Sequence, residues 1–205
     1  MATSELVEMV QNREDEDFFI GLQSRLTHFT TEQMGKTLSR LRHAELRTWP
    51  TDLLESYLDD LNRAIEERNS LTLMRASYMY GSSLGGFGGG SEFYVQKENV
   101  EHVNFIMKVS LIWETQCRTV LPHLTRNMSP ILSEDDSDSG EYVSYETRLH
   151  SELMTYSYKT LAVYAGYVAS CWINKQNANF EVYNEAAREL GYNCAADAEQ
   201  NQVTL

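Results

Sequence analysis

Cysteine and histidine side chains bind metals and act as nucleophiles or bases, so their spacing is the first test for chemistry in this chain. The three cysteines, Cys117, Cys171 and Cys194, are far apart and form no C-x-x-C pair. The histidines stand singly, without the H-x-x-x-H or H-E-x-x-H spacing of a metal site: His28, His43, His102, His123 and His150. We therefore expect reduced, mostly buried thiols, no metal and no cofactor. Because no nucleophile, base and orienting group can be placed together, we also expect no catalytic residue and no enzyme activity.

An acidic segment, residues 133–146, contains oxygen side chains at the spacing of a calcium loop. It resembles an EF-hand loop, whose ligand and glycine positions are occupied here by Asp135, Ser137, Ser139, Gly140 and Glu146. The two serines supply no charge, and Pro130 interrupts the helix that would enter the loop. We therefore expect an acidic, solvated loop between helices rather than a calcium site.

The same segment offers sites for phosphorylation. Ser133 precedes the acidic run 134–136, a pattern that acidophilic kinases of the casein kinase 2 type favour, and Ser139 lies in a stretch similar to a phosphodegron. A phosphate added to an already negative loop would need an arginine-rich partner in order to dock. Ser133 and Ser139 are therefore candidate modification sites.

Residues 15–46 begin with an acidic run, continue with an aromatic pair, and contain a Thr-Thr turn ahead of glutamate and lysine. This pattern resembles the BESS motif, a protein-interaction element of chromatin-associated transcriptional regulators in insects. The resemblance implies two short helices, a nuclear protein that regulates transcription, and contact residues Phe18, Phe19, Leu22, Leu26, Phe29 and Leu38. Met34 and Gly35 replace charged positions of the second helix, which leaves an ordinary helical hairpin as the alternative.

Aromatic side chains are frequent on the helical faces of the second half of the chain. Nine of the 12 tyrosines follow residue 92. The rings that stand on helical faces are those of Trp113, Trp172, Tyr156, Tyr164 and Tyr167. Packing in a core or an interface, with hydroxyl groups that reach a partner, is the expected role. A ligand pocket lined by tyrosines is the alternative.

Six of the 11 glycines fall within residues 81–90. A phosphate-binding loop would follow a strand and carry G-x-x-x-x-G-K-[ST], whereas here a helix precedes and that pattern is absent. Gly/Ser-rich chains behave as flexible coils, so residues 81–91 are predicted to be a linker, and residues 88–93 resemble a cloning scar. The chain would then consist of two helical segments, 1–80 and 92–205, which come from one gene or from two partners joined in a single chain.

Apolar residues recur at three- and four-residue steps, which predicts an all-α protein of about six helices packed in a bundle. The expected helices are a short one from about residue 14 and others at about 31–47, 51–78, 95–121, 145–175 and 179–190. In the second of these, Met34, Leu38, Leu41 and Glu45 form one stripe. Residues 195–205 have the composition of a polar tail.

Charge and hydropathy exclude several classes of protein. The formal net charge is −13, which opposes nucleic-acid binding, and no apolar run is long enough to span a bilayer. The N-terminus lacks the features of a signal peptide, so an intracellular protein without a membrane or nucleic-acid partner is expected. The segments 1–80 and 92–205 carry net charges of −5 and −8, so hydrophobic faces rather than charge would hold them together as a heterodimer.

These observations favour a non-enzymatic protein-interaction or scaffold module. A viral or other structural assembly protein is one alternative. A small-molecule-binding helical protein or enzyme with a tyrosine-lined pocket is the other.

Overall fold

The computed structural model describes residues 3–24, 36–80, 99–133 and 143–205, and all regular structure within these ranges is helical. Nine helices occur in them, rather than about six. Their bounds are α1 Thr3–Ser24, α2 Lys36–Thr48, α3 Thr51–Glu66, α4 Leu71–Tyr80, α5 Val100–Val120, α6 Tyr145–Leu153, α7 Tyr158–Ile173, α8 Ala178–Glu189 and α9 Ala195–Gln200.

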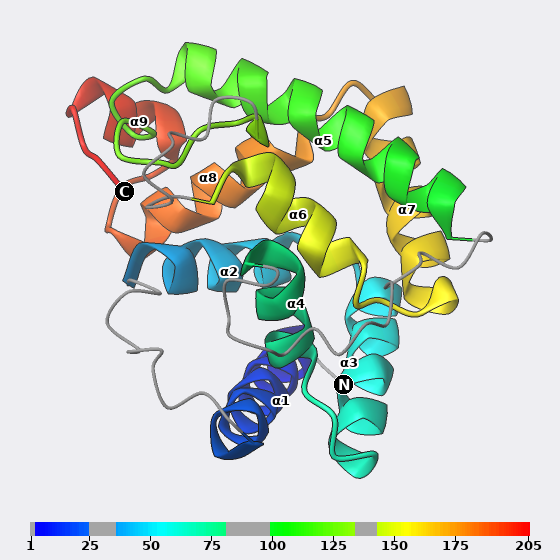
Figure 1. Ribbon diagram of the computed structural model, residues 1–205. Coiled ribbons are helices and arrows are strands. Elements are labelled where there is room, and N and C mark those ends of the chain that lie inside the picture. Colours follow the sequence, from blue (N-terminus) through cyan, green and yellow to red (C-terminus); the bar gives the residue numbers. More distant parts are fainter. Residues whose placement is uncertain (1–2, 25–35, 81–98, 134–142) are drawn as a thin grey trace.

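The helices pack around two hydrophobic clusters. Figure 1 shows α5 along the top of the molecule, α2 and α6 across the middle, and α1 and α3 below them. The larger cluster draws on α1 to α7, and the smaller one joins α8, α9 and the end of α5 with Ala44 of α2. Leu54 and Leu61 from α3 lie in the larger cluster together with Ile106 from α5 and Leu161 from α7. Helices from both sides of the glycine-rich segment therefore share one core, while residues 81–91 themselves lie outside the described residues.

Two long helices expected from the apolar stripes are each divided in two. The stripe over 51–78 is interrupted after α3, where Arg68 adopts a left-handed conformation with φ of 56°. The stripe over 145–175 is interrupted before α7, where the hydroxyl of Ser157 accepts a hydrogen bond of 3.2 Å from the backbone N–H of Thr160. Apolar spacing continues across both breaks because the two helices on either side face the same core.

Helical structure begins earlier and ends later in the chain than the sequence pattern predicts. α1 begins at Thr3 because Leu6, Val7 and Val10 form a buried face within a polar sequence. Residues 195–205, despite their polar composition, contain α9 and end in the buried Leu205, whose backbone N–H donates to the carbonyl of Leu124.

The first turn of α4 is capped by a side chain from α1. Asp17 is fully buried, and its carboxylate accepts hydrogen bonds from the backbone N–H groups of Leu71 and Thr72 at 2.7 and 2.8 Å. The hydroxyl of Ser70 donates to the same carboxylate at 3.3 Å and accepts from the N–H of Leu73. A negative charge at this position satisfies N–H groups that have no partner within the helix.

Gly21 of α1 lies against this cap. A Cβ atom at Gly21 would approach the Ser70 hydroxyl oxygen to 2.8 Å, and that oxygen is held by Asp17 and Leu73. We expect Gly21→Ala to destabilise the fold by about 1 to 2 kcal/mol, because the clash outweighs the better helix propensity of alanine. The free energy of unfolding in urea measures this effect.

Gly166 in α7 provides the matched control. Nothing lies within 4 Å of a Cβ atom built at Gly166, so Gly166→Ala is expected to stabilise the chain by roughly 0.5 to 1 kcal/mol. Two alanine substitutions with the same sign would contradict the close approach of α1 to α4.

Candidate functional site

Two arginines and three glutamates meet in the centre of the molecule, where five helices and the turn after α6 converge. We call this group, with its two tyrosines, the arginine–glutamate cluster. Its members are Glu14 from α1, Arg42 and Glu45 from α2, Tyr57 from α3, Arg75 from α4, Glu152 from α6 and Tyr156 from the turn between α6 and α7. The charged side chains keep only 11 to 19% of their surface exposed.

Arg42 binds all three glutamates of the cluster. Its Nε and Nη2 donate to Glu14 Oε1 at 2.9 and 2.8 Å. Its Nη1 lies 2.8 Å from Glu45 Oε2 and 2.7 Å from Glu152 Oε1. The planar guanidinium suits this arrangement, because its donors point in fixed directions towards several carboxylates at once.

Arg75 completes the cluster from α4. Its Nη2 donates to the hydroxyl of Tyr57 at 2.5 Å, and that hydroxyl in turn donates to Glu14 at 2.7 Å. Its Nε donates to the hydroxyl of Thr155 at 3.4 Å. One chain of hydrogen bonds therefore connects α1, α3, α4 and the turn after α6.

Aromatic rings surround the two guanidinium groups. The Cζ atom of Arg42 lies 4.9 Å from the ring centre of Trp49 and 5.2 Å from that of Tyr57. The Cζ atom of Arg75 lies 5.6 Å from Tyr57 and 5.9 Å from Tyr156. Such rings stabilise the cations and keep bulk water away from them.

The two glutamates that share the Nη1 group of Arg42 have opposite pKa shifts. Burial, followed by repulsion from Glu152, raises the pKa of Glu45 above its ordinary value. Burial alone would also raise the pKa of Glu152, but the charges of Arg42 and Arg75 and the hydrogen bond from Tyr156 lower it to about 2. The cluster thus contains one carboxylate that holds a proton readily and one that stays ionised.

These shifts predict how stability depends on pH. The folded chain binds a proton at Glu45 more tightly than the unfolded chain does, so protonation of Glu45 favours folding as the pH falls. Glu152 acts in the opposite direction, and its contribution is lost as the pH falls from about 4.5 to about 2. We expect Glu152→Gln to flatten the loss of stability in that window, measured by urea unfolding at a series of pH values. Parallel curves for wild type and Glu152→Gln between pH 4.5 and 2 would contradict the assignment.

A cavity of about 730 Å³ adjoins the cluster and shares Tyr156 with it. The Tyr156 hydroxyl donates to Glu152 at 2.5 Å, so one side chain belongs both to the cluster and to the cavity wall. The lining residues come from α3, from the N-terminal end of α5, from the last residue of α6, from the turn after it and from the first residues of α7: Asp59, Asp60, Arg63, Asn99, Val103, Leu153, Met154, Tyr156, Ser157, Tyr158, Lys159 and Leu161.

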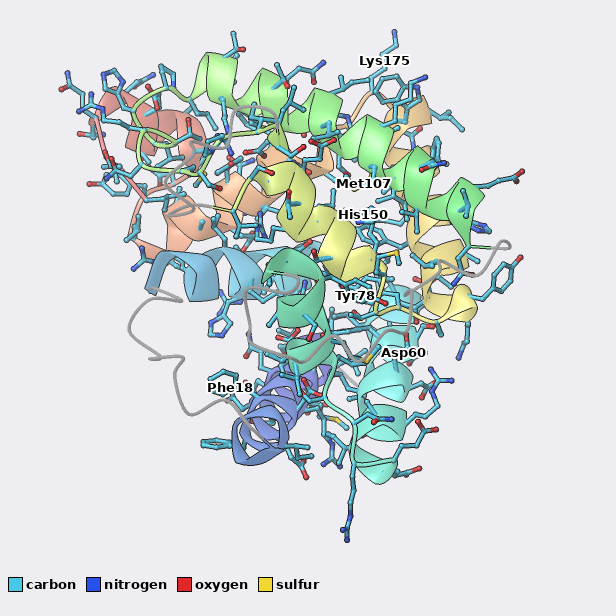
Figure 2. The ribbon with its side chains drawn as sticks, viewed as in Figure 1. Phe18, Asp60, Tyr78, Met107, His150 and Lys175 are labelled. Carbon is cyan, nitrogen blue, oxygen red and sulfur yellow. The ribbon has the colours of Figure 1, made fainter. Side chains whose placement is uncertain are left out.

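Asp60 lines the cavity and holds the neighbouring turn in place. Figure 2 shows Asp60 on α3, below the turn between α6 and α7. Asp60 is 4% exposed, accepts from the backbone N–H of Ser157 at 2.9 Å, and forms an ion pair with Arg63 at 2.5 Å. In contrast, the oxygen Oδ1 of Asn99 is buried without a hydrogen-bond partner. The cavity therefore combines a rigid wall with an unused acceptor.

The family model described as a protein of unknown function, DUF4125, matches residues 4–200, which include the cluster, the cavity and the glycine-rich segment. The chain belongs to the DUF4125 family. No curated protein matches it. No solved structure matches it either. Among the described residues of this DUF4125 chain, no helix is long and apolar enough to cross a membrane, and no group of histidine, cysteine or carboxylate side chains is placed to hold a metal.

The interaction residues expected from the BESS resemblance fall only in part on described residues of the DUF4125 chain. Phe18 and Phe19 lie on α1 with ring centres 6.3 Å apart, and Phe19 is 61% exposed. Leu22 and Leu38 lie within α1 and α2, and nothing is described of their side chains. The remaining two, Leu26 and Phe29, lie outside the described residues, so this interaction surface stays a prediction.

Of the two candidate phosphorylation sites, only Ser133 is described. Its backbone N–H and its hydroxyl both donate to Glu146 Oε2 at 2.9 Å. Glu146 is the last ligand position of the expected calcium loop, so this carboxylate instead holds the start of the acidic segment. Ser139 and most of that loop lie outside the described residues, and phosphorylation stays a prediction.

The three cysteines of this DUF4125 chain are free thiols, and Cys117 and Cys171 are buried, as their spacing predicts. Burial raises the pKa of Cys117 to about 12, which keeps it protonated and unreactive.

The charged members of the arginine–glutamate cluster were not identified from the sequence. The sequence contains one sign of a buried charge, because Glu45 stands on the apolar stripe of its helix. Glu152 gives a similar signal, since it lies between Leu149 and Tyr156 on the buried face of α6 and its turn.

Proposed function

We propose that this chain binds a small polar organic molecule in the cavity beside Tyr156. The observation that carries the proposal is a cavity of about 730 Å³ that shares a wall residue with a buried cluster of perturbed ionisable groups. Ligand sites in proteins have volumes of this size, and they combine an apolar lining with a few fixed polar groups. Val103, Leu153 and Leu161 supply apolar lining here.

The cluster supports binding because it holds the cavity wall in place. Tyr156 is fixed by Glu152, which is bound to Arg42, and Ser157 is fixed by Asp60. A wall that is already ordered loses little conformational entropy when a ligand binds. We therefore assign the arginine–glutamate cluster a positioning role rather than direct contact with the ligand.

The residues that line the cavity favour the binding of a ligand without a chemical reaction. The described lining residues include neither cysteine nor histidine. Both carboxylates among them are paired, Asp59 with Lys159 and Asp60 with Arg63.

A panel of small polar compounds tests the proposal. Amino acids, diamines, polyols, dicarboxylates and nucleosides are added one at a time, and equilibrium dialysis measures binding to the full chain. Met154 lines the cavity and is half-buried, so Met154→Trp is expected to fill the space and abolish binding. Met9→Trp, at a position 44% exposed on α1, is the matched control and is expected to bind normally. Failure of every panel member to bind the folded wild-type chain would contradict the proposal.

A second candidate function, protein interaction, is favoured by the end of α7. Trp172 and Ile173 are 46% and 76% exposed, and the ring centre of Trp172 lies 6.3 Å from that of the buried Trp113. Large apolar side chains next to each other on a surface are typical of interaction sites. Affinity capture from extracts of the native host, with wild type compared with Ile173→Glu, tests this candidate. The same set of captured proteins for both would contradict it.

The proposal that the two halves hold each other together is supported by their shared hydrophobic core. Separate expression of residues 1–80 and 92–205, followed by mixing, tests it. If the halves fail to bind each other, this part of the proposal is lost. The origin of the halves in one gene or two, and a nuclear role in transcription, stay predictions.

A further inference from the structure

We propose that the ligand of the cavity beside Tyr156 is an organic amine, bound through its ammonium group by Asn99 and Asp59. This inference rests on the proposed function, since it names the chemical class of the molecule that occupies the same cavity. Four features carry it: an unpaired buried acceptor, an exchangeable ion pair, an exposed aromatic ring at the cavity and the charge of the whole chain.

The first feature is Asn99. It occupies the position before the first residue of α5, where an asparagine side chain ordinarily caps the helix, yet its side chain makes no capping bond. Its Oδ1 is buried, has no partner and belongs to a residue that lines the cavity. A buried acceptor left unpaired costs free energy. Because Oδ1 has no exposed surface, the Asn99 side chain turns towards the cavity when a ligand donates a hydrogen bond to it, and that bond recovers the cost.

A histidine ring nitrogen near Asn99 in the sequence is also buried and unpaired. Nδ1 of His102 is also buried without a partner, one turn along from Asn99. The His102 ring meets that of Tyr158 edge-on with centres 5.4 Å apart, and Tyr158 lines the cavity. When the histidine proton is on Nε2, both unpaired atoms are hydrogen-bond acceptors, and a donor from a ligand can pair with them.

The second feature is the pair formed by Asp59 and Lys159. Lys159 Nζ lies 2.9 Å from Asp59 Oδ2, and the two side chains are 67% and 66% exposed. An exposed pair of this kind contributes little to stability. A ligand ammonium can therefore replace the lysine ammonium at Asp59 at small cost, while Lys159 moves into solvent.

The third and fourth features also select a cation. Tyr158 lines the cavity and is 53% exposed, and aromatic rings attract ammonium groups. The chain carries a formal net charge of −13, so its field concentrates cations and repels anions. A carboxylate ligand would have to take Arg63 from the buried Asp60 or Lys159 from Asp59, and either exchange would add an uncompensated negative charge to a chain that is already strongly acidic.

Three probes of the same length separate the possible ligand classes. They are 1,4-diaminobutane, butane-1,4-diol and succinate, and each is titrated into the full chain by isothermal calorimetry at low salt. We expect the diamine alone to bind. We also expect its affinity to fall as salt is added, because exposed charge interactions are screened.

Substitution of Asn99 tests the position of the ammonium group in both directions. Asn99→Leu removes the acceptor and is expected to weaken binding of the diamine about tenfold, whereas Asn99→Asp adds a charge and is expected to tighten it about tenfold. Glu8→Gln removes one negative charge from the exposed surface of α1 and is the control, with unchanged affinity expected. Circular dichroism confirms that each variant is folded.

The possible outcomes distinguish this inference from the proposed function. If the diol or succinate binds in preference to the diamine, the amine class is wrong but small-molecule binding stands. If the diamine binds with equal affinity to wild type, Asn99→Leu and Asn99→Asp, the placement beside Asn99 is wrong. If none of the three probes binds while another panel compound does, the amine inference fails alone, and if no compound binds at all, both fail.

Discussion

Arg42→Met is expected to lower the free energy of unfolding by about 4 kcal/mol, measured in urea at neutral pH. The substitution keeps much of the side-chain volume but removes the cation that Glu14, Glu45 and Glu152 share. Three largely buried carboxylates would then face one another with only the charges of Arg75 and Arg148 to offset them. Arg42→Lys is expected to recover only part of the loss, because one ammonium cannot reproduce the fixed donors of the guanidinium.

Arg47→Met is the matched control for this experiment. Arg47 lies on the same helix, is 50% exposed, and pairs with Glu189 at 3.3 Å. Removal of a surface pair of this kind is expected to cost less than 1 kcal/mol. If Arg42→Met and Arg47→Met cost the same, the three glutamates of the cluster would not depend on Arg42 as described above.

Asp17→Ala is the second substitution with a large expected effect, a loss of about 3 kcal/mol in the free energy of unfolding. It removes the acceptor for the backbone N–H groups of Leu71 and Thr72 and leaves both inside the protein without a partner. Asp17→Asn retains a neutral acceptor and is expected to cost about 1 kcal/mol. Hydrogen exchange of the α4 amides is expected to speed up more than that of α8 in the Asp17→Ala variant.

Asp15→Ala controls for the loss of charge in the same acidic run. Asp15 is exposed, so its removal is expected to change stability by no more than about 0.5 kcal/mol. Equal effects of Asp15→Ala and Asp17→Ala, or uniform acceleration of exchange over α4 and α8, would contradict the capping role of Asp17.

Helical class and most of the helix faces could be predicted from the sequence, because periodic apolar residues report burial directly. The helix at 178–189 was placed within a residue or two, and Gly191, with φ of 89°, follows it as expected of a helix end. The division of two long helices was not predicted. Ser157 caps α7 within a continuous apolar stripe, so periodicity alone gives no sign of the break.

The cluster and the cavity could not be predicted because their residues are far apart in the chain and each has an ordinary local role. Asp17 and Glu14 belong to an acidic run that suits a helix surface, yet one caps α4 and the other binds Arg42. Asn99 is typical of a helix N-terminus, and only its burial without a partner marks it. Such contacts depend on tertiary packing, for which one sequence carries little signal.

The most direct test of the proposed function is to map which residues of the protein a bound compound perturbs. Amide chemical shifts are recorded by NMR for the full chain as each compound of the panel is titrated. We expect the amides of Arg63, Ser157, Tyr158 and Lys159 to shift with a single saturating curve, while those of α9 stay unchanged. Saturable shifts centred on α8 and α9, or no saturable shift with any compound, would contradict a ligand site beside Tyr156.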